Sequence, residues 1–346
     1  MSKILFIDNG IEFDSKMAKH RPVGGAESAF ISLVEALAKN KNEVVVYNNC
    51  VNTGKINGVF WKRLGEEIND ETFDVLVVNR GDKFLDFKKE CNRRFFWIHN
   101  PANYLLKWRY LKKIFLHPCK IIFSSNYHSS TYPKWGPNKE KLTIPYGIDD
   151  FILDIKKKKR NSKSRNAIFT SNPMRGLNWL LDRWEYEIFP SVKGAELDLY
   201  TGFSTYGEFG IKNRQSMTPV LKRAQRLRLK GVNLYNPINR KLLMEKIFNS
   251  RVFLYQGSKE ETFCMSLAEA QVIGIPAVVS DLGCMKERVI DKKTGFVCNS
   301  NRDFSDAAIK LLTDDKLWKK IHKNMLKKIN NYQSWNEIAR MWEKVI

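Results

Sequence analysis

The sequence predicts an α/β protein made of two doubly wound parallel-sheet domains. Short apolar runs of strand length alternate with segments of helical periodicity along the chain. A proline–glycine turn and a basic run interrupt this alternation once, near residue 150, and it then resumes. A chain of 346 residues is long enough for about two domains, each with its own core.

The first half of the chain supplies the elements of one domain. A helical pattern covers residues 26–38 and separates the first two strand candidates. This order indicates a parallel sheet, since parallel neighbours need a crossover connection. The strand candidates are residues 3–7, 43–47, 74–78, 94–98 and 120–124.

The second half repeats the pattern and predicts a second doubly wound domain. A helical pattern at residues 240–248 separates two of its apolar runs. Ligands of open parallel sheets bind outside the carboxyl ends of the strands, so we expect a cleft between the facing strand-end loops of the two domains. The strand candidates are residues 167–170, 197–200, 232–235, 252–255 and 277–279.

The domain boundaries follow from the interruption and from the end of the chain. We place the N-terminal domain at residues 1–148 and the C-terminal domain at residues 149–330. Residues 331–346 are predicted to form a terminal helix. Ser334 and Glu337 have the spacing of a capping box that opens such a helix.

Composition indicates an ordinary intracellular globular protein. The six cysteines are scattered without a Cys-x-x-Cys pair, so neither a zinc cluster nor a disulfide framework is indicated. No apolar run approaches the roughly 20 residues that span a bilayer. Residues 1–8 predict a first strand rather than a signal peptide. We therefore expect a cytoplasmic protein with free thiols.

Charge is the unusual feature of the composition. The chain has 59 Lys plus Arg against 37 Asp plus Glu, a net charge of +22. This imbalance favours attraction to an anionic surface: nucleic acid, acidic lipid or a phosphorylated substrate. The densest run, residues 156–160, continues to Lys163 and Arg165 without an aromatic residue. Because bases would stack on aromatic rings, this run favours a solvated linker, and no specific nucleic-acid partner is expected.

Two carboxylates, Glu261 and Glu269, lie eight positions apart around a predicted helix start. If the intervening segment is helical, eight steps advance about 12 Å and return to nearly the same face. Between them, the backbone N–H groups of Phe263 and Cys264 would form an electropositive first turn, which suits a diphosphate. Two glutamates at this spacing also occur by chance on many solvated helices.

Further motifs give this pair a context. The chain resembles the retaining family 4 glycosyltransferases of the GT-B fold, in which a Glu, seven residues and a second Glu are followed by a Gly-x-Pro turn. The resemblance implies two facing Rossmann-like domains with a cleft between them, and a terminal helix that crosses back to the first domain. The matching segments, in the family's order, are GGAE at 24–27, WIHNP at 97–101, IPYGID at 144–149, SNPMRGL at 171–177, and GIP at 274–276 after the glutamates.

The resemblance assigns the donor to the second domain. It implies that Glu261 contacts hydroxyls of the donor sugar and that Glu269 bridges the ribose hydroxyls. Arg175, where the family usually has lysine, would neutralise charge on the leaving diphosphate. The groups expected to bind sugar or phosphate belong to Ser171, Phe263 and Cys264, and the nucleobase is expected near Asn236, Pro237 and Ile238.

The first domain contributes a glycine loop and a histidine. Gly24 and Gly25 directly precede a predicted helix, where a bare backbone lets the donor or acceptor approach the N–H groups. His99 ends an apolar strand, and the resemblance implies that it contacts the transferred sugar. Glu261, Arg175 and His99 are thus the catalytic candidates, and we expect them to line an exposed cleft.

Three departures from the family pattern concern the donor loops. No basic residue stands at residues 169–171, where the family has an additional arginine, so Ser171 or a basic residue from elsewhere would complete the diphosphate contacts. Gln256 replaces a proline that often precedes the first glutamate. Gly283 is followed by Cys284, where a Gly-Gly pair is common.

The resemblance implies a retaining glycosyltransferase that needs no metal or cofactor. It would move a sugar from a nucleoside-diphosphate sugar to a glycan, glycolipid or similar acceptor, as in polysaccharide biosynthesis. Two alternatives stay open. A charge of +22 also suits a nucleic-acid-binding protein, whose binding would depend on salt and not on nucleotide-sugars. A GT-B epimerase or phosphorylase would instead form isomerised sugar or sugar phosphate.

A segment after His99 combines aromatic, aliphatic and basic side chains. Residues 104–116 have the composition of an interfacial helix, which would bring a lipid-linked acceptor to an anionic membrane at its inner face. The same segment could instead bury its apolar residues against the sheet and leave the basic ones in water. Both alternatives stay open from the sequence.

Overall fold

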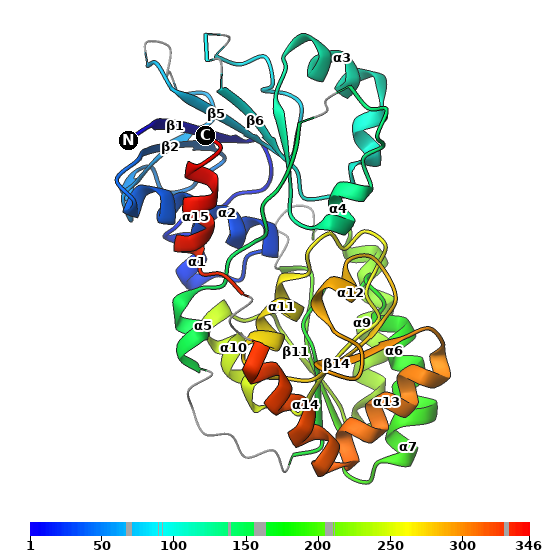
Figure 1. The fold of residues 1–346 in the computed structure, drawn as a ribbon. Helices are drawn as coiled ribbons and strands as arrows, with labels where there is room; N and C mark the ends of the chain where they lie inside the picture. The colour runs from blue at the N-terminus through cyan, green and yellow to red at the C-terminus, as the bar shows by residue number, and fades with distance from the viewer. Residues whose placement is uncertain are drawn as a thin grey trace. The chain divides into compact units, whose positions relative to one another are not determined.

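A computed structural model describes residues 1–66, 71–88, 90–91, 93–137, 140–155, 164–204, 210, 212–328 and 332–346. The chain divides into two compact units (Figure 1). Unit 1 contains residues 1–147 and 333–346, and unit 2 contains residues 148–332. Residues 156–163, which hold most of the predicted basic linker, lie outside the described residues.

The strands of unit 1 form one sheet in the order β3-β4-β2-β1-β5-β6-β7-β8. Neighbouring strands are parallel except β3 and β4, which form an antiparallel pair at the edge. Their buried apolar runs explain why the central strands could be predicted. The strands are β1 (Lys3–Asp8), β2 (Glu43–Asn48), β3 (Gly54–Ile56), β4 (Val59–Arg63), β5 (Val75–Asn79), β6 (Arg93–Trp97), β7 (Lys120–Phe123) and β8 (Lys141–Thr143).

The core of unit 1 includes the terminal helix. Ser334 and Glu337 form the predicted capping box, which begins α15 (Trp335–Glu343). This helix packs on α2 (Gly25–Lys39), and the ring of Trp342 lies 5.3 Å from that of Trp97. The other helical segments of the unit are α1 (Met17–His20), η1 (Ala102–Leu106), α3 (Trp108–Leu116) and α4 (Asn126–Ser130).

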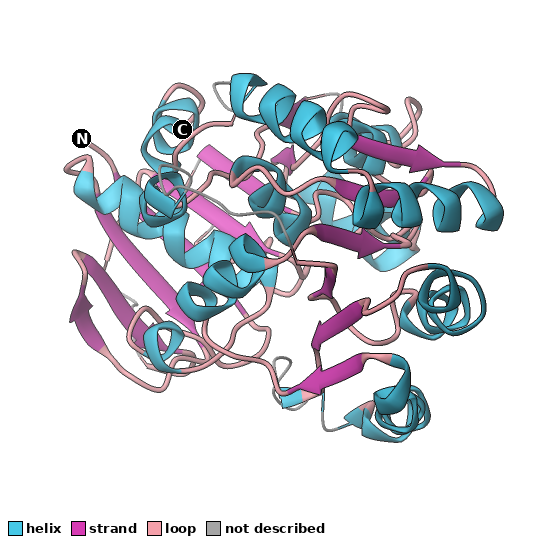
Figure 2. Cartoon of the chain, turned by 90° about the horizontal axis from the view of Figure 1, so that it is seen from below, coloured by secondary structure: helices cyan, strands magenta, loops and turns pink. Residues whose placement is uncertain are grey.

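Unit 2 has a parallel sheet in the order β11-β10-β9-β12-β13-β14, the doubly wound order 3-2-1-4-5-6. Figure 2 shows the strands of each sheet side by side with helices against them. The strands are β9 (Asn166–Phe169), β10 (Glu196–Tyr200), β11 (Val232–Tyr235), β12 (Val252–Tyr255), β13 (Ala277–Ser280) and β14 (Gly295–Cys298). The helical segments are α5 (Asp150–Ile155), α6 (Leu177–Arg183), η2 (Trp184–Ile188), α7 (Phe189–Ser191), α9 (Arg214–Arg226), η4 (Leu227–Lys230), α10 (Arg240–Asn249), α11 (Met265–Val272), α12 (Met285–Arg288), α13 (Asn301–Thr313) and α14 (Asp315–Lys328).

Each predicted strand segment corresponds to a strand, and the prediction of an α/β fold with two parallel-sheet units is confirmed. β3, β4, β8 and β14 were not predicted. They are three to five residues long and only partly buried, so they lack the continuous apolar run that marks a central strand. Among the described residues, no helix is both long and apolar enough to cross a bilayer.

The strand order places a switch point in each sheet. The order reverses between β1 and β5 in unit 1, and between β9 and β12 in unit 2. In open α/β sheets, ligands bind at the carboxyl ends of the strands on either side of this point. The two loops that follow β9 and β12 contain Arg175 and Glu261, and β1 and β5 end at Asp8 and Asn79.

Candidate functional site

Glu261 lies in the loop between β12 and α11, before the helix begins. The helix starts at Met265, and its cap residue Cys264 has a left-handed backbone with φ 60°. Glu261 and Glu269 therefore do not share a helix face, and the helical rise does not apply to their separation. The left-handed residue turns the chain just before the helix, which the spacing of the glutamates could not reveal.

A compact polar network holds the carboxylate of Glu261. The Arg175 guanidinium donates to Glu261 Oε1 at 2.5 Å, and the Tyr255 hydroxyl donates to the same oxygen at 2.5 Å. The Ser171 hydroxyl donates to the Tyr255 oxygen at 3.2 Å. Burial, followed by the charge of Glu261, raises the pKa of Tyr255 well above its ordinary value. Three of the predicted site residues are thus brought together, and Tyr255 is a member that the sequence did not indicate.

The two predicted carboxylates are buried, contrary to the expectation of an exposed cleft. Glu261 is 6% exposed and Glu269 is 4% exposed. A buried carboxylate needs a cation or several donors to remain ionised, and each of these has an arginine. The Arg175 side chain is 36% exposed, so the network opens to solvent on the arginine side.

Two glycines allow the loops around Glu261 to approach one another. Gly283 has φ 58°, and a Cβ there would lie 2.4 Å from the Ser258 carbonyl oxygen and 2.7 Å from that of Glu261. Gly176 has φ 81°, and a Cβ there would lie 2.5 Å from the Gln256 side-chain oxygen. Both departures from the family pattern, at Gln256 and after Gly283, therefore leave the close contact of these loops intact.

The N-terminus of α11 follows this network directly. Phe263 and Cys264 are buried, and the Arg288 guanidinium lies 4.2 Å from the centre of the Phe263 ring. The first turn of α11 contains no acidic residue, so the positive end of the helix dipole is not neutralised from within the helix. Burial raises the pKa of the Cys264 thiol well above its ordinary value, so it is a neutral filler and not a nucleophile.

Glu269 is held by Arg240, a residue that the sequence analysis missed. The Arg240 Nε donates to Glu269 Oε1 at 2.7 Å, its Nη2 donates to the same oxygen, and its Nη1 pairs with Asp149. Burial raises the pKa of Glu269, and the charge of Arg240 opposes that shift. The helix dipole disfavours a cation in the first turn of α10, where Arg240 lies. This unfavourable position was the feature of the sequence that could have indicated an ion-pair partner for Arg240 elsewhere.

The predicted nucleobase loop leads into this pair. Asn236, Pro237 and Ile238 follow β11, and the Asn239 side chain then caps α10 by accepting from Leu242 N at 3.1 Å. The next residue is Arg240, whose side chain reaches Glu269. The loop and the second glutamate are therefore joined through one side chain.

In unit 1, Arg80 occupies the switch point between two carboxylates. Its Nη2 donates to Glu27 Oε1 at 2.6 Å, and its Nε lies 3.2 Å from Asp8 Oδ2. Burial lowers the pKa of Arg80, but the charges of Glu27 and Asp8 outweigh this and raise it above its ordinary value. Burial likewise raises the pKa of Asp8 against the opposing charge of Arg80. Sequence reasoning missed Asp8 and Arg80, although both directly end or follow buried strands.

Gly24 and Gly25 lie at the start of α2, as the sequence predicts, but the carboxylate of Glu27 turns back toward them. A Cβ at Gly24 would lie 2.2 Å from Glu27 Oε2, so a larger residue there would displace this carboxylate. A phosphate at this helix end would meet a buried carboxylate, whereas a sugar hydroxyl would find a hydrogen-bond acceptor. This arrangement favours a hydroxylated ligand over a phosphate beside Gly24.

His99 follows β6, and both of its ring nitrogens are hydrogen-bonded within unit 1. Its Nε2 lies 2.7 Å from Asn79 Oδ1, and its Nδ1 lies 2.5 Å from the Tyr146 hydroxyl. Asn79 also donates to Asp8 Oδ2. Burial, followed by the charge of Arg80, lowers the pKa of His99 well below its ordinary value. The ring is therefore neutral and fixed in orientation.

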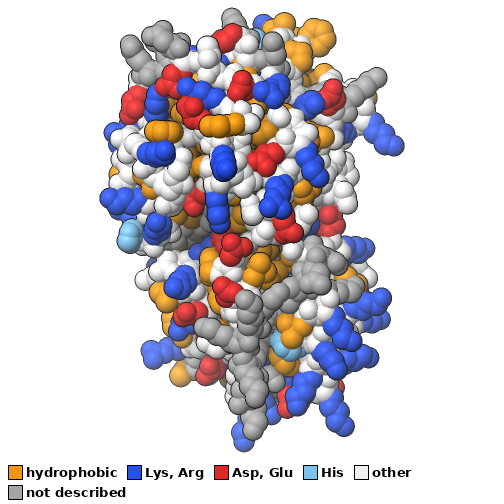
Figure 3. All heavy atoms as spheres, turned by 60° about the vertical axis from the view of Figure 1, so that its left-hand side comes forward, with side chains coloured by type: hydrophobic (Ala, Val, Ile, Leu, Met, Phe, Trp, Pro, Cys, Tyr) orange, Lys and Arg blue, Asp and Glu red, His pale blue; other side chains and the backbone are white. Residues whose placement is uncertain are grey.

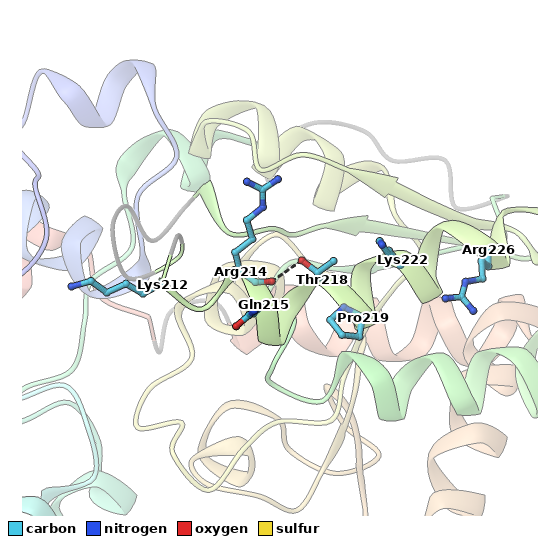
Figure 4. A pocket seen from close by; sticks show the side chains of 7 residues that line it. All are labelled: Lys212, Arg214, Gln215, Thr218, Pro219, Lys222 and Arg226. Carbon is cyan, nitrogen blue, oxygen red and sulfur yellow. Dashed lines mark hydrogen bonds between the residues drawn. The ribbon is translucent and has the colours of Figure 1, made fainter.

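A pocket of about 580 Å³ runs along α9, and none of the predicted site residues lines it (Figure 4). Arg223 on the same helix pairs with Asp182 and Glu185. The basic side chains of the pocket itself form no ion pair among the described residues. It is lined by Lys212, Arg214, Gln215, Thr218, Pro219, Lys222 and Arg226. Basic side chains are also spread over the face drawn in Figure 3, with acidic ones between them.

Comparison with known proteins finds a family model that matches part of this chain. The family description "glycosyl transferases group 1" matches residues 213–328, a range that contains Glu261, Glu269 and Arg240. The match covers about a third of the chain, and this part is similar to the group 1 glycosyltransferases. The α-1,3/1,6-mannosyltransferase of Dictyostelium discoideum is 25% identical over 220 residues, 61% of this chain and 49% of that protein. The chain thus spans about half the length of the curated relative that it matches.

Solved structures of glycosyltransferases share the fold of this chain. Sucrose-phosphate synthase of Thermosynechococcus elongatus has a TM-score of 0.75 at 14% identity, covering 100% of this chain and 98% of that one. HepE of Anabaena, solved with UDP and glucose, also has a TM-score of 0.75 at 14% identity, covering 99% of both chains. At such low identity the likeness concerns the fold, and the predicted GT-B fold is confirmed.

Proposed function

We propose that this protein transfers a sugar from a nucleoside-diphosphate sugar to a hydroxyl of a glycan or lipid-linked acceptor, with retention of configuration and without a metal ion. The observation that carries the proposal is the Arg175–Glu261 pair at the switch point of unit 2, directly before the N-terminus of α11. A cation and a helix dipole suit a leaving diphosphate, and the carboxylate suits sugar hydroxyls.

Each group has a role in the bond changes of this reaction. The bond from the anomeric carbon to the diphosphate oxygen breaks, and the electron pair leaves with the diphosphate, where Arg175 and the α11 N-terminus would stabilise it. Glu261 would accept hydrogen bonds from sugar hydroxyls while positive charge develops on the ring. Glu269 would accept from the ribose, with Ser171 as a further donor to phosphate. The acceptor oxygen forms the new bond to the anomeric carbon, and its proton passes to the departing diphosphate.

Release of the nucleoside diphosphate from a panel of UDP-, GDP- and ADP-sugars tests the proposal. UDP-glucose comes first because the neighbour HepE was solved with UDP and glucose, and mannosyl donors follow because of the mannosyltransferase relative. We expect one donor to be hydrolysed slowly and transferred faster when acceptor is present. A sugar phosphate or an isomerised sugar as the product, or no turnover of any donor with any acceptor, would contradict the proposal.

The two finer parts of the proposal have their own measurements. Nuclear magnetic resonance of the product gives the anomeric configuration, which should match that of the donor. Turnover should persist in a chelator that removes divalent cations. An inverted product would refute retention, and activity that returns only with added metal would refute metal independence.

We further propose that α3 docks on an anionic membrane, where a lipid-linked acceptor would be presented. Tyr110 and Ile114 face the core, whereas Trp108, Phe115 and Leu116 are 77%, 76% and 57% exposed. The helix therefore combines the two alternatives that the sequence left open, because some of its apolar side chains are buried and others are exposed. Exposed aromatic and aliphatic side chains between basic ones suit an interface with acidic lipids.

Co-sedimentation with vesicles of neutral or anionic lipid tests this docking. Lys107→Glu with Lys112→Glu should abolish binding to anionic vesicles, and Trp108→Ala should weaken it. Lys113 is left unchanged because its ammonium donates to the backbone carbonyls of residues 82 and 83. The matched control reverses two exposed lysines of α14, Lys316 and Lys320. Equal loss of binding in the control would refute docking through α3.

A further inference from the structure

We infer that Asn79 and Tyr146 are positioning residues that hold His99 as one neutral tautomer, with the proton on Nε2. The inference rests on the proposed function and deepens it, because the family resemblance of the sequence implies that His99 contacts the transferred sugar. Its first test does not depend on that function, since the tautomer can be observed without turnover.

The donor and the acceptor of each hydrogen bond between Asp8, Asn79 and His99 can be assigned by starting from Asp8. Asp8 Oδ1 accepts from Gly10 N at 2.6 Å and its other oxygen faces the Arg80 guanidinium, so Asp8 is a carboxylate and can only accept. The Asn79 group that faces Asp8 must therefore be its amide nitrogen. The carbonyl oxygen of Asn79 then faces His99.

The orientation of Asn79 decides the tautomer of His99. A carbonyl oxygen can only accept, so the Nε2 atom at 2.7 Å must carry a hydrogen. A neutral ring then has no hydrogen on Nδ1, which accepts from the Tyr146 hydroxyl at 2.5 Å. A second proton on the ring would reverse this bond, because Nδ1 would then donate to the Tyr146 oxygen.

The charged surroundings of His99 also disfavour a cationic ring. Arg80 and His128 are the nearby groups that lower its pKa, after burial. The carboxylates of Asp8 and Glu27 both pair with Arg80. The ring nitrogens of His99 contact Asn79 and Tyr146 instead.

Tyr146 is itself fixed by the terminal helix. Its ring stacks on Trp335, the first residue of α15, with ring centres 6.3 Å apart and planes inclined by 27°. A Cβ on the neighbouring Gly147 would lie 2.8 Å from the Trp335 backbone. The hydroxyl that holds His99 thus belongs to a tightly packed turn, and a chain of bonds from Asp8 to Tyr146 leaves the imidazole one orientation.

This arrangement limits what His99 contributes to sugar transfer. A histidine that stays neutral cannot donate a full positive charge to the leaving group or act as a general acid near neutral pH. It presents an uncharged ring of fixed orientation. The pH dependence of turnover should accordingly lack a histidine ionisation near pH 6.5, the ordinary value.

Magnetic resonance of histidine labelled with a nitrogen isotope tests the inference on the full chain. The protein has five histidines, and His99→Gln identifies the signals of His99 by their loss. We expect the neutral tautomer with hydrogen on Nε2, unchanged when the pH is lowered to about 5.5, a unit below the ordinary pKa. Hydrogen on Nδ1, or titration near the ordinary value, would overturn the inference in the unmodified protein.

Tyr146→Phe provides the second measurement. Removing the hydroxyl deletes the donor from which Nδ1 accepts, so the ring should lose its single tautomer: a signal for hydrogen on Nδ1 should appear, and the pH profile of kcat/KM should change with it. The matched control is Tyr132→Phe in the same unit, because that buried hydroxyl has no hydrogen-bond partner. A Tyr146→Phe protein whose His99 signals and profile match those of Tyr132→Phe would also overturn the inference. If no donor is turned over, the proposed function is refuted. The tautomer of His99, measured without turnover, still tests whether Asn79 and Tyr146 position the ring.

Discussion

Replacing Glu261 by glutamine tests the proposed donor site most sharply. The amide has nearly the shape of the carboxylate, and its oxygen can still accept from Arg175 and Tyr255, which both donate to Oε1. The change therefore removes the negative charge and little of the packing. Loss of one oriented charged contact in the transition state costs about 3 kcal/mol, roughly a hundredfold in rate. Release of nucleoside diphosphate should fall by about that factor, while the folded protein loses only about 1 kcal/mol.

The comparison with Arg175→Ala separates catalysis from stability. Removing the arginine leaves Glu261, 6% exposed, with the Tyr255 hydroxyl and no cation, and breaking a buried pair costs about 3–5 kcal/mol. Arg175→Ala should thus lower both the rate and the free energy of unfolding, and adding Glu261→Gln should restore stability but not rate. Glu260→Gln, an exposed neighbour, is the matched control. A Glu261→Gln enzyme as fast as this control would refute the proposed site.

Three further predictions follow from other side chains. Arg240→Met removes the charge that opposes the raised pKa of Glu269, so the acidic limb of the pH–rate profile should move to higher pH; an unmoved limb would show that Glu269 is not needed in ionised form. Burial lowers the pKa of His128 from 6.5 to about 4, so folding stability should fall as pH drops through this interval, by about 3 kcal/mol in all. Urea unfolding at several pH values should show this loss, and His128→Gln should flatten it. Arg214→Glu with Lys222→Glu should leave donor turnover unchanged, because both side chains line the α9 pocket and not the proposed donor site; loss of turnover would place that pocket within the active site.

The sequence predicted the central strands because their burial leaves a continuous apolar run that needs no knowledge of distant residues. The site residues behave differently. Glu261 and Arg175 were found from motifs, but their pairing joins positions 86 residues apart, and no local pattern carries that information. Arg240 was missed for the same reason, since its partner Glu269 is 29 residues away. The burial of Glu261 and Glu269 was not predicted, because a glutamate is expected to be exposed unless the arginine that pairs with it is known.

The turn between the two units shows how these distant pairings are organised. Tyr146 and Asp149 flank the point where the chain passes from unit 1 to unit 2, between residues 147 and 148. Tyr146 holds the imidazole of His99 in unit 1, and Asp149 pairs with the arginine that holds Glu269 in unit 2. Two of the proposed ligand contacts, His99 and Glu269, are therefore tied, each within its own unit, to one side of the same short turn. Residues 144–149 do more than connect two domains, since a change in their backbone would disturb the orientation of a proposed ligand-contacting group on each side.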